Sequence, residues 1–293
     1  MAKVMFDFNN LAIRTVFSAD VLTRNDKKEI IDVDWETWRL YTFSSLYGAL
    51  FAVKNVSEII VAIDSKPSWR LGIWNRYKES RKAKRDVSTL DWDLFFVNYN
   101  QLIADLKTHF PFKFMEVPRC EADDIIGVLT LNTEEKIHII SMDKDFLQLS
   151  CDRVSIYDPL KKTNVSHPNP DIFLIEQCLI GQKKDDIYNI ITPLDHPHGK
   201  RKPGFGPAAL EKVMVYGWYG WLQDNNLVDR FKFNLRLMDF RMIPEDVKAT
   251  VLKEYNDYVL PPPDMIYNFF KDHEWPTYIE KLTAVENNLY RLY

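Results

Sequence analysis

The stretch Lys136-Ile-His-Ile-Ile-Ser-Met-Asp-Lys-Asp145 decides the fold, because an apolar run stops there at two aspartates. Two other runs have the same form, KVMFDF at 3–8, which contains Asp7, and EIIVAID at 58–64. Two more strand-like runs and two helix-length segments alternate with them: 111–117, 154–157, 34–54 and 92–109. Apolar runs that alternate with helices are typical of a parallel sheet covered on both faces. We therefore predict an α/β fold with a central, mostly parallel sheet flanked by helices.

The strand pattern ends near residue 170, and helical segments punctuated by proline follow to the end of the chain. They lie at 170–180, 206–217, 226–239, 245–258 and 264–271. We expect an α/β domain over residues 1–180 and a helical domain over 181–293. With 293 residues, 46% of them hydrophobic, the chain is long enough to bury a sizeable core and is not disordered.

Several classes of protein are disfavoured. No apolar run approaches eighteen residues, and the N-terminus does not have the form of a signal peptide, so membrane spanning and secretion are not expected. Cys120, Cys151 and Cys178 are widely spaced and indicate reduced thiols. No G-x-S-x-G motif supports a Ser/His/Asp hydrolase, and His196 and His198 are expected at the surface.

Acidic residues carry the chemistry. Asp7, Asp64 and Asp143 each follow a strand-like run, and ligand sites of parallel sheets form at the carboxyl ends of strands. Further candidates are Glu121, Asp123, Asp124, Asp145 and Asp185. A single acid at a strand end is usually a helix N-cap, but a convergent set repels itself unless cations neutralise it. Oxygen donors alone suit Mg²⁺ or Mn²⁺, and such sites are the usual equipment of two-metal phosphodiester cleavage.

The charge distribution fits this interpretation. Without the eight candidate acids, the formal net charge changes from −4 to +4, which suits a protein that binds a phosphate backbone. Eight basic residues lie between Lys66 and Arg85, directly after Asp64. This segment is either a solvated charged helix or a phosphate-contacting element in which Tyr77 stacks on a base. Its position beside Asp64 favours the second interpretation.

A second basic cluster precedes a glycine-containing turn, Lys200-Arg201-Lys202-Pro-Gly204-Phe-Gly206-Pro207. We expect Gly204 and Gly206 to allow a tight hairpin and Pro207 to begin a helix, whose first N–H groups would face a phosphate. The alternative is an ordinary loop and helix start.

Taken in order, these motifs resemble the bacteriophage 5′-nuclease (flap endonuclease) superfamily, in particular its T-even phage ribonuclease H group. They are Asp7, Asp64, Trp69-Arg70, Tyr77-Lys78-x-x-Arg81, Glu121-Ala-Asp123-Asp124, Asp143-x-Asp145 and Gly204-Phe-Gly-Pro. The similarity covers nearly the whole chain. It implies a nuclease domain of the kind shared with PIN proteins, a basic helical arch at about 66–90, and a helix-three-turn-helix element that binds duplex DNA in the C-terminal part.

The resemblance also implies two Mg²⁺ ions, with Mn²⁺ as a substitute. One would be bound by Asp7, Asp64, Glu121, Asp123 and Asp143, and the other by Asp145 and Asp185 with Asp124 nearby. The basic arch residues Lys78, Arg81 and Arg85 would hold the scissile phosphate, beside Tyr77. Arg70, Lys200, Arg201, Lys202, Gly204 and Gly206 would contact the nucleic acid. Metal-activated water would hydrolyse the phosphodiester and leave a 5′-phosphate.

The implied activity is that of a 5′-to-3′ exonuclease and flap endonuclease with ribonuclease H activity. Its substrates would be branched or flapped DNA and RNA–DNA hybrids, from which it removes primers and flaps during phage DNA replication in the host cytoplasm. A phage single-stranded-DNA-binding protein and a sliding clamp are the implied partners of a monomer that does not bind membranes. A PIN-class ribonuclease is less favoured, because such proteins are generally shorter and do not have the glycine motif.

One departure from the family pattern concerns the second metal. Phage members usually carry Gly-Asp-x-x-Asp-Asn where this chain has Gly181-Gln-Lys-Lys-Asp-Asp186. Gln182 thus replaces a carboxylate, and its amide could still hold a metal-bound water. We predict a weaker second metal site with activity retained, and partial compensation by Asp186. Gln182 also supports an alternative, a catalytically weak module that binds branched DNA.

Overall fold

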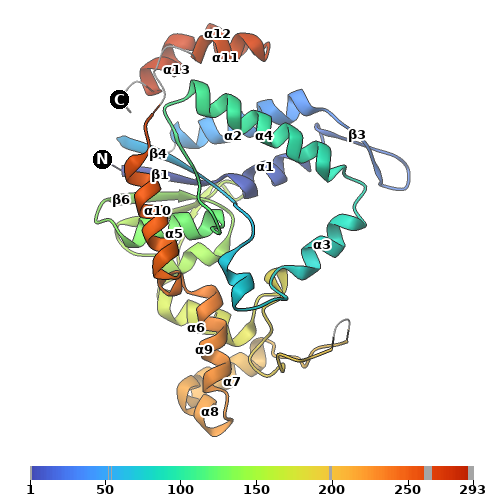
Figure 1. Ribbon diagram of the computed structural model, residues 1–293, viewed down its shortest axis with the longest axis vertical. Helices are drawn as coiled ribbons and strands as arrows, with labels where there is room; N and C mark the ends of the chain where they lie inside the picture. Colours follow the sequence, from blue (N-terminus) through green and yellow to red (C-terminus); the bar gives the residue numbers. More distant parts are fainter. Residues whose placement is uncertain (1, 52, 54, 198–199, 261–265, 290–293) are drawn as a thin grey trace.

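The structure is a computed structural model that describes residues 2–51, 53, 55–197, 200–260 and 266–289 (Figure 1). A six-stranded sheet forms its centre. In spatial order the strands are β5 (Lys113–Glu116), β4 (Val56–Ile63), β1 (Ala2–Asp7), β6 (Lys136–Ile140), β7 (Val154–Asp158) and β8 (Thr163–Val165). Neighbouring strands are parallel except β7 and β8, so the predicted mostly parallel α/β sheet is confirmed.

Both faces of the sheet are buried, because successive side chains of a strand point to opposite faces. In β1, Val4 and Phe6 join one hydrophobic cluster and Met5 joins another. The first cluster is covered by α1 (Phe8–Val16), α2 (Trp35–Phe51) and α4 (Trp92–His109). The second is covered by α5 (Ala122–Leu131) and α10 (Glu245–Asp257), which lie on the opposite side of the sheet in Figure 1.

The C-terminal helices divide between two places. A third cluster is formed by α6 (Pro170–Ile180), α7 (Pro207–Tyr216), α8 (Trp218–Asp224) and α9 (Val228–Met238), at the lower end of Figure 1. The last helices, α11 (Ile266–Asp272), α12 (Pro276–Glu280) and α13 (Leu282–Leu289), instead join the cluster of α2 and α4. The division into domains at residue 180 stays a prediction.

Local sequence explains the helix starts that were predicted well. Asp91 caps α4 by accepting a hydrogen bond from the Leu94 backbone N–H at 2.9 Å, and Asn169 caps α6 in the same way through Ile172. Pro207 begins α7, as predicted. Within the described residues, no helix combines the length and the apolar character that crossing a membrane requires.

Several short elements were not predicted. Among the described residues they are the hairpin of β2 (Leu22–Arg24) and β3 (Ile30–Val33), the edge strand β8, the helices α1, α5, α8, α12 and α13, and the 3₁₀ turns η1 (Trp69–Gly72), η2 (Lys144–Leu149), η3 (Lys183–Asp185) and η4 (Phe240–Met242). The basic segment after β4 contains η1 and then α3 (Glu79–Asp86), which stands between α4 and the lower helical cluster in Figure 1. His198 lies outside the described residues.

Candidate active site

The predicted acids meet at the carboxyl edge of the three central strands. Asp7 is the last residue of β1, Asp64 directly follows β4, and Asp143 follows β6. These strands are neighbours and parallel, so their ends share one edge of the sheet. The Ser141 hydroxyl lies 3.4 Å from Asp7 Oδ2, and Asp64 Oδ1 accepts a hydrogen bond from the Ala122 backbone N–H at 2.8 Å, which attaches the start of α5 to the same edge.

Burial and mutual repulsion make ionisation of two of these carboxyls unfavourable. Burial, with the neighbouring charges of Asp64 and Asp143, raises the pKa of Asp7 to about 7. Burial likewise raises the pKa of Asp64, although the Lys78 ammonium partly offsets it. Asp7 is therefore only partly ionised at neutral pH unless a further positive charge lies beside it.

The start of α5 adds three more acids whose oxygens lie within 4.8 Å of one another: Glu121, Asp123 and Asp124. Asp124 accepts a hydrogen bond from the Glu121 backbone N–H at 3.0 Å, which closes a capping box. Asp123 Oδ1 and Asp124 Oδ1 are both buried and make no hydrogen bond within the described part of the chain, but Asp124 Oδ1 forms an ion pair with Arg70 at 2.8 Å. Burial raises the pKa of Asp123 well above its ordinary value.

Arg70 is an internal residue, although we predicted it in the nucleic-acid-binding set. Its side chain is 3% exposed and contacts Asp124 at 2.8 Å and Glu121 at 3.1 Å. Its Nε also donates to the Leu237 carbonyl oxygen at 2.8 Å, and the Trp69 indole N–H donates to Asp124 at 3.0 Å. Asp124 is therefore held by Arg70 and Trp69, and we leave Arg70 out of the proposed nucleic-acid surface.

Tyr77 and Lys78 hold Glu121 from the other side. The Tyr77 hydroxyl donates to Glu121 Oε2 at 2.6 Å from a buried ring, and the Lys78 ammonium contacts Glu121 Oε1. Burial alone would raise the pKa of Glu121, but the charges of Lys78 and Arg70 outweigh it and lower that pKa. The structure thus places the Tyr77 ring in the protein interior, where it positions Glu121 rather than offering a face to a base.

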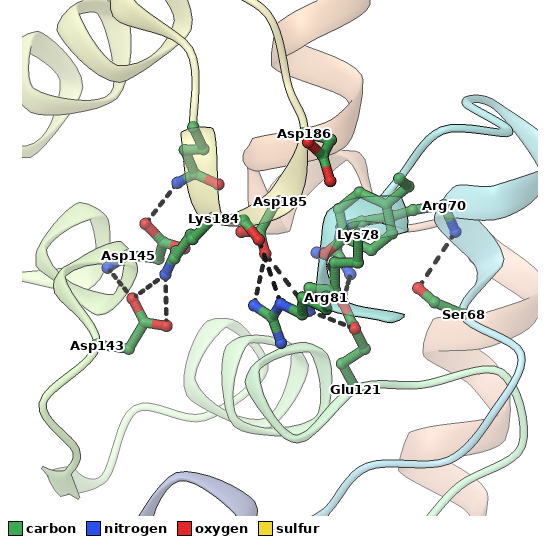
Figure 2. A network of polar contacts seen from close by, with 12 residues as sticks. Ser68, Arg70, Lys78, Arg81, Glu121, Asp143, Asp145, Lys184, Asp185 and Asp186 are labelled. Carbon is green, nitrogen blue, oxygen red and sulfur yellow. Dashed lines mark hydrogen bonds and ion pairs between the residues drawn. The ribbon is translucent and has the colours of Figure 1, made fainter. Parts of the chain in front are cut away.

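The turn η3 brings Asp185 to the site (Figure 2). Asp185 is buried and pairs with Arg81 at 2.6 Å, while Lys78 Nζ lies 3.8 Å away. The next residue, Asp186, does not join the acidic cluster as the predicted compensating charge. Its Oδ2 instead accepts a hydrogen bond from the Ser80 backbone N–H at 2.7 Å and so holds the first turn of α3.

Lys184 is a site residue that sequence reasoning missed. Its ammonium contacts both oxygens of Asp143 at 2.7 Å and Asp145 Oδ2 at 3.0 Å (Figure 2). Gln182 donates from Nε2 to Asp145 Oδ1 at 2.6 Å. Burial would raise the pKa of Asp143, but Lys184 lowers it; for Asp145, burial and the charge of Asp143 prevail and the pKa is raised. Lys184 occupies an unspecified position of the Gly-Asp-x-x-Asp-Asn motif, directly before Asp185, so the motif gives no signal of this role.

A groove of about 1210 Å³ runs from the acids along α3 and α4. Asp64, Glu121 and Lys78 line one part of it. Its basic part contains Lys66, Arg81, Lys84 and Arg85, and its apolar part contains Trp92, Phe96, Tyr99 and Ile103 from α4. The predicted phosphate-holding residues Lys78, Arg81 and Arg85 therefore share one groove with two of the acids.

The second basic cluster, Lys200 to Lys202, does not line this groove. Lys200 and Arg201 are exposed, and the Lys202 ammonium lies 3.8 Å from the centre of the Tyr188 ring. The tight hairpin predicted at Gly204 and Gly206 is not formed: residues 201–206 contain no turn, neither glycine adopts a positive φ, and a Cβ at either would have open space. His196 is half-buried, and its carbonyl oxygen accepts a hydrogen bond from Arg76 at 2.7 Å.

The donor set fits hard divalent cations. All candidate ligand atoms are carboxylate oxygens, which Mg²⁺ and Mn²⁺ prefer. The buried Asp123 Oδ1 makes no hydrogen bond within the described residues, and burial disfavours ionisation of Asp7, Asp64 and Asp123. A cation at this edge would stabilise the ionised form of all three side chains.

Two family models match the chain. The model of the 5′–3′ exonuclease N-terminal, resolvase-like domain matches residues 3–174, and the model of the T4 RNase H C-terminal region matches residues 168–285. The ribonuclease H of Enterobacteria phage T4 is 31% identical over 227 residues, which cover 73% of this chain and 74% of the relative. A 5′–3′ exonuclease of Buchnera aphidicola is 32% identical over 131 residues, 41% of this chain and 42% of the relative.

Solved structures of phage T5 proteins have the same fold. The bacteriophage T5 flap endonuclease, crystallised with DNA and metal ions, superposes with a TM-score of 0.64 at 18% identity, over 88% of this chain and 98% of that chain. The T5 5′-exonuclease with bound zinc gives a TM-score of 0.61 at 17% identity, over 88% and 99% of the two chains. At such low identity the likeness shows a shared fold.

Proposed function

The chain belongs to the 5′–3′ exonuclease family and is a nuclease, and from this premise we propose that it is a Mg²⁺-dependent, structure-specific 5′ nuclease. It would hydrolyse phosphodiesters at the 5′ ends of flaps and of RNA primers. The observation that carries the proposal is the buried, unpaired Asp123 oxygen within an all-carboxylate cluster at the end of a basic groove.

Two groups of side chains would hold the ions. Asp7, Asp64, Glu121 and Asp123 would hold the first ion and Asp145 and Asp185 the second, with Asp143 between the two, because its charge acts on Asp7 and it shares Lys184 with Asp145. Asp124 instead positions Glu121, since Arg70 and Trp69 engage it. Bound divalent ions would supply Lewis-acid activation of water and charge neutralisation at the phosphate.

The protein's own cations would orient the substrate. Lys78 and Arg81 lie between the acids and the groove, and Arg85 lines the same groove farther along α3. Guanidinium groups bind phosphate oxygens in pairs, so Arg81 and Arg85 suit contacts with a phosphate backbone that enters along α3. Phosphate binding there would draw Arg81 away from Asp185.

The relatives support the proposed substrates. The T5 flap endonuclease was crystallised with DNA, and the T4 relative is a ribonuclease H, so we propose flapped or branched DNA and RNA–DNA hybrids. The exposed Lys200 and Arg201 would contact the duplex part of the substrate. We further propose a monomer that acts in the host cytoplasm, with a single-stranded-DNA-binding protein and a sliding clamp as partners.

The test is cleavage of 5′-labelled flap and RNA–DNA substrates with Mg²⁺ and with EDTA. We expect short 5′ products with Mg²⁺ alone. Asp123→Asn keeps the side-chain shape and should lower the rate on the order of 10²- to 10³-fold, because it removes a charged cation ligand. Asp152→Asn removes the same charge from an exposed residue and should cleave like the wild type. Equal rates for the two variants would contradict the proposed site.

A second function, binding of branched DNA with weak cleavage, is favoured by one observation. Lys184 and Gln182 engage the carboxylate oxygens of Asp143 and Asp145, where the second ion would bind. Tight binding of flapped DNA without cleavage, under Mg²⁺ and Mn²⁺ alike, would identify the chain as such a module.

A further inference from the structure

The acids Asp143 and Asp145 have a positive partner within the protein. All three donor positions of the Lys184 ammonium are accounted for by Asp143 Oδ1, Asp143 Oδ2 and Asp145 Oδ2, at 2.7, 2.7 and 3.0 Å. The remaining oxygen, Asp145 Oδ1, accepts the hydrogen bond from Gln182 at 2.6 Å. Gln182 and Lys184 together therefore provide a partner for each of the four carboxylate oxygens of Asp143 and Asp145.

This arrangement differs from the one around Asp123. Asp123 Oδ1 is buried without a hydrogen bond in the described structure, whereas Asp143 and Asp145 share a neutralising charge. Repulsion between two carboxylates normally calls for an external cation. At this pair the Lys184 ammonium supplies that charge, and the Gln182 amide adds no negative charge.

We propose that Lys184 is an internal counter-cation for Asp143 and Asp145, which the second divalent ion must displace in order to bind. The inference rests on the proposed function, since it concerns the second of two metal ions. Displacement is feasible because the Lys184 side chain is 43% exposed and belongs to the short turn η3, so its ammonium can move into solvent. The consequence is one strong ion position and one weak position.

The test measures free Mn²⁺ by electron paramagnetic resonance in solutions of the 293-residue chain. Bound Mn²⁺ is the total Mn²⁺ added minus this free Mn²⁺. Lys184→Met keeps a long, unbranched side chain and removes its charge. Lys183→Met removes the same charge from the neighbouring exposed residue and is the matched control. We expect the wild type and Lys183→Met to bind one Mn²⁺ tightly and a second weakly. In Lys184→Met the second ion should bind at least roughly tenfold more tightly, because no ammonium competes for the oxygens.

Thermal unfolding in EDTA gives a readout that does not depend on metal binding. There, Lys184→Met should have a lower Tm than Lys183→Met, because Asp143 and Asp145 lose their counter-charge. Added Mn²⁺ should raise the Tm of Lys184→Met more than that of the control. Two equally tight Mn²⁺ positions in the wild type, or identical Mn²⁺ binding by the two variants, would overturn the inference.

These outcomes are separable from those of the proposed function. If the wild type cleaves flaps but both lysine variants bind Mn²⁺ alike, the inference is wrong and the nuclease function stands. If no variant cleaves, yet Lys184→Met has a lower Tm in EDTA and gains affinity for the second Mn²⁺, the counter-cation role of Lys184 stands without the nuclease function.

Discussion

At the scale of single residues, the acids fall into two groups according to whether the protein's cations or burial dominate their pKa. Lys78 and Arg70 lower the pKa of Glu121, and Lys184 lowers that of Asp143. Burial outweighs the neighbouring cations at Asp7, Asp64 and Asp123 and raises the pKa of each, and the same holds for Asp145, although Lys184 contacts it. The second group is where a bound divalent ion would change the electrostatic energy most.

The raised pKa of Asp7 predicts a pH-dependent stability of the metal-free protein. Its pKa is about 7 in the fold against an ordinary value of 3.8, so its contribution to stability is full below pH 4 and is lost as the pH rises through 7. Each unit of that difference corresponds to about 1.4 kcal/mol. In EDTA, the wild-type Tm should therefore fall between pH 5 and pH 8 relative to the Tm of Asp7→Asn.

The comparison with Asp7→Asn isolates this one residue. Asn also serves as an N-cap, so the cap of α1 that Asp7 provides through Asn10 is retained. His138, whose pKa is lowered by burial, acts in the opposite direction but equally in both proteins. Parallel changes of Tm with pH in the two proteins would contradict the assignment of a raised pKa to Asp7.

Residue roles were predictable where strand ends determined them and unpredictable where tertiary contacts did. The strand ends predicted that Asp7, Asp64 and Asp143 would converge. Arg70 and Arg81 look alike within a basic run, yet only Arg70 is almost fully buried, because Asp124 and the Leu237 carbonyl oxygen lie beside it. These partners are 54 and 167 positions away in sequence, beyond the reach of local patterns.

At the scale of elements, the turn η3 connects the acidic site to the basic helix. Its Asp185 carbonyl oxygen accepts a hydrogen bond from the Lys78 backbone N–H at 3.0 Å, and Asp186 accepts one from the Ser80 N–H. The Arg81 side chain also reaches this turn. The start of α3 and the proposed second metal position are therefore attached to the same few residues.

Gly181, which ends α6 and leads into η3, is expected to be irreplaceable. Its φ is +75° with ψ 176°, and a Cβ would lie 2.5 Å from the Ile187 carbonyl oxygen and 2.6 Å from the Asn189 nitrogen. The backbone conformation alone costs another residue roughly 1–3 kcal/mol, and the contact with backbone atoms adds to this. Gly181→Ala should lower the free energy of unfolding in urea by at least that amount and reduce cleavage.

Gly204→Ala is the matched control for this prediction. A Cβ at Gly204 meets nothing within 4 Å, so the free energy of unfolding should change by less than about 0.5 kcal/mol. Equal destabilisation by the two substitutions would show that the backbone of η3 adapts to a side chain at Gly181.

Elements with strong local signals were predicted well, and weak ones were not. The helix α4 covers residues 92–109 as predicted, because Asp91 caps it and its aromatic residues face the core. The hairpin of β2 and β3 was missed, since its strands are three and four residues long and mostly exposed, which leaves no clear alternation. The same shortness explains the missed helix α12.

At the scale of the whole molecule, the end of the chain stabilises its beginning. The helices α11 and α12 add Phe269, Phe270 and Tyr278 to a cluster that also contains Phe6 of β1 and Val61 of β4. The ring of Phe43 from α2 lies 5.5 Å from Phe269 and 5.6 Å from Phe270, measured between centroids. The strands that carry Asp7 and Asp64 therefore share one core with the C-terminal helices.

Phe269→Ala should accordingly shift the unfolding of the strands that carry the acids, not of the C-terminal helices alone. Phe269 is 1% exposed and also packs on Phe110 and Trp275, so removing its ring should cost about 3–5 kcal/mol. The control Tyr267→Ala alters the same helix at a side chain that is 45% exposed and should cost far less. In urea, the unfolding transitions followed by tryptophan fluorescence and by far-ultraviolet circular dichroism should shift together for Phe269→Ala. On heating, Phe269→Ala should lose nuclease activity at a lower temperature than Tyr267→Ala. If only a small early transition moved while the main one stayed in place, the C-terminal helices would be a separate folding unit, and the active-site strands would not depend on them.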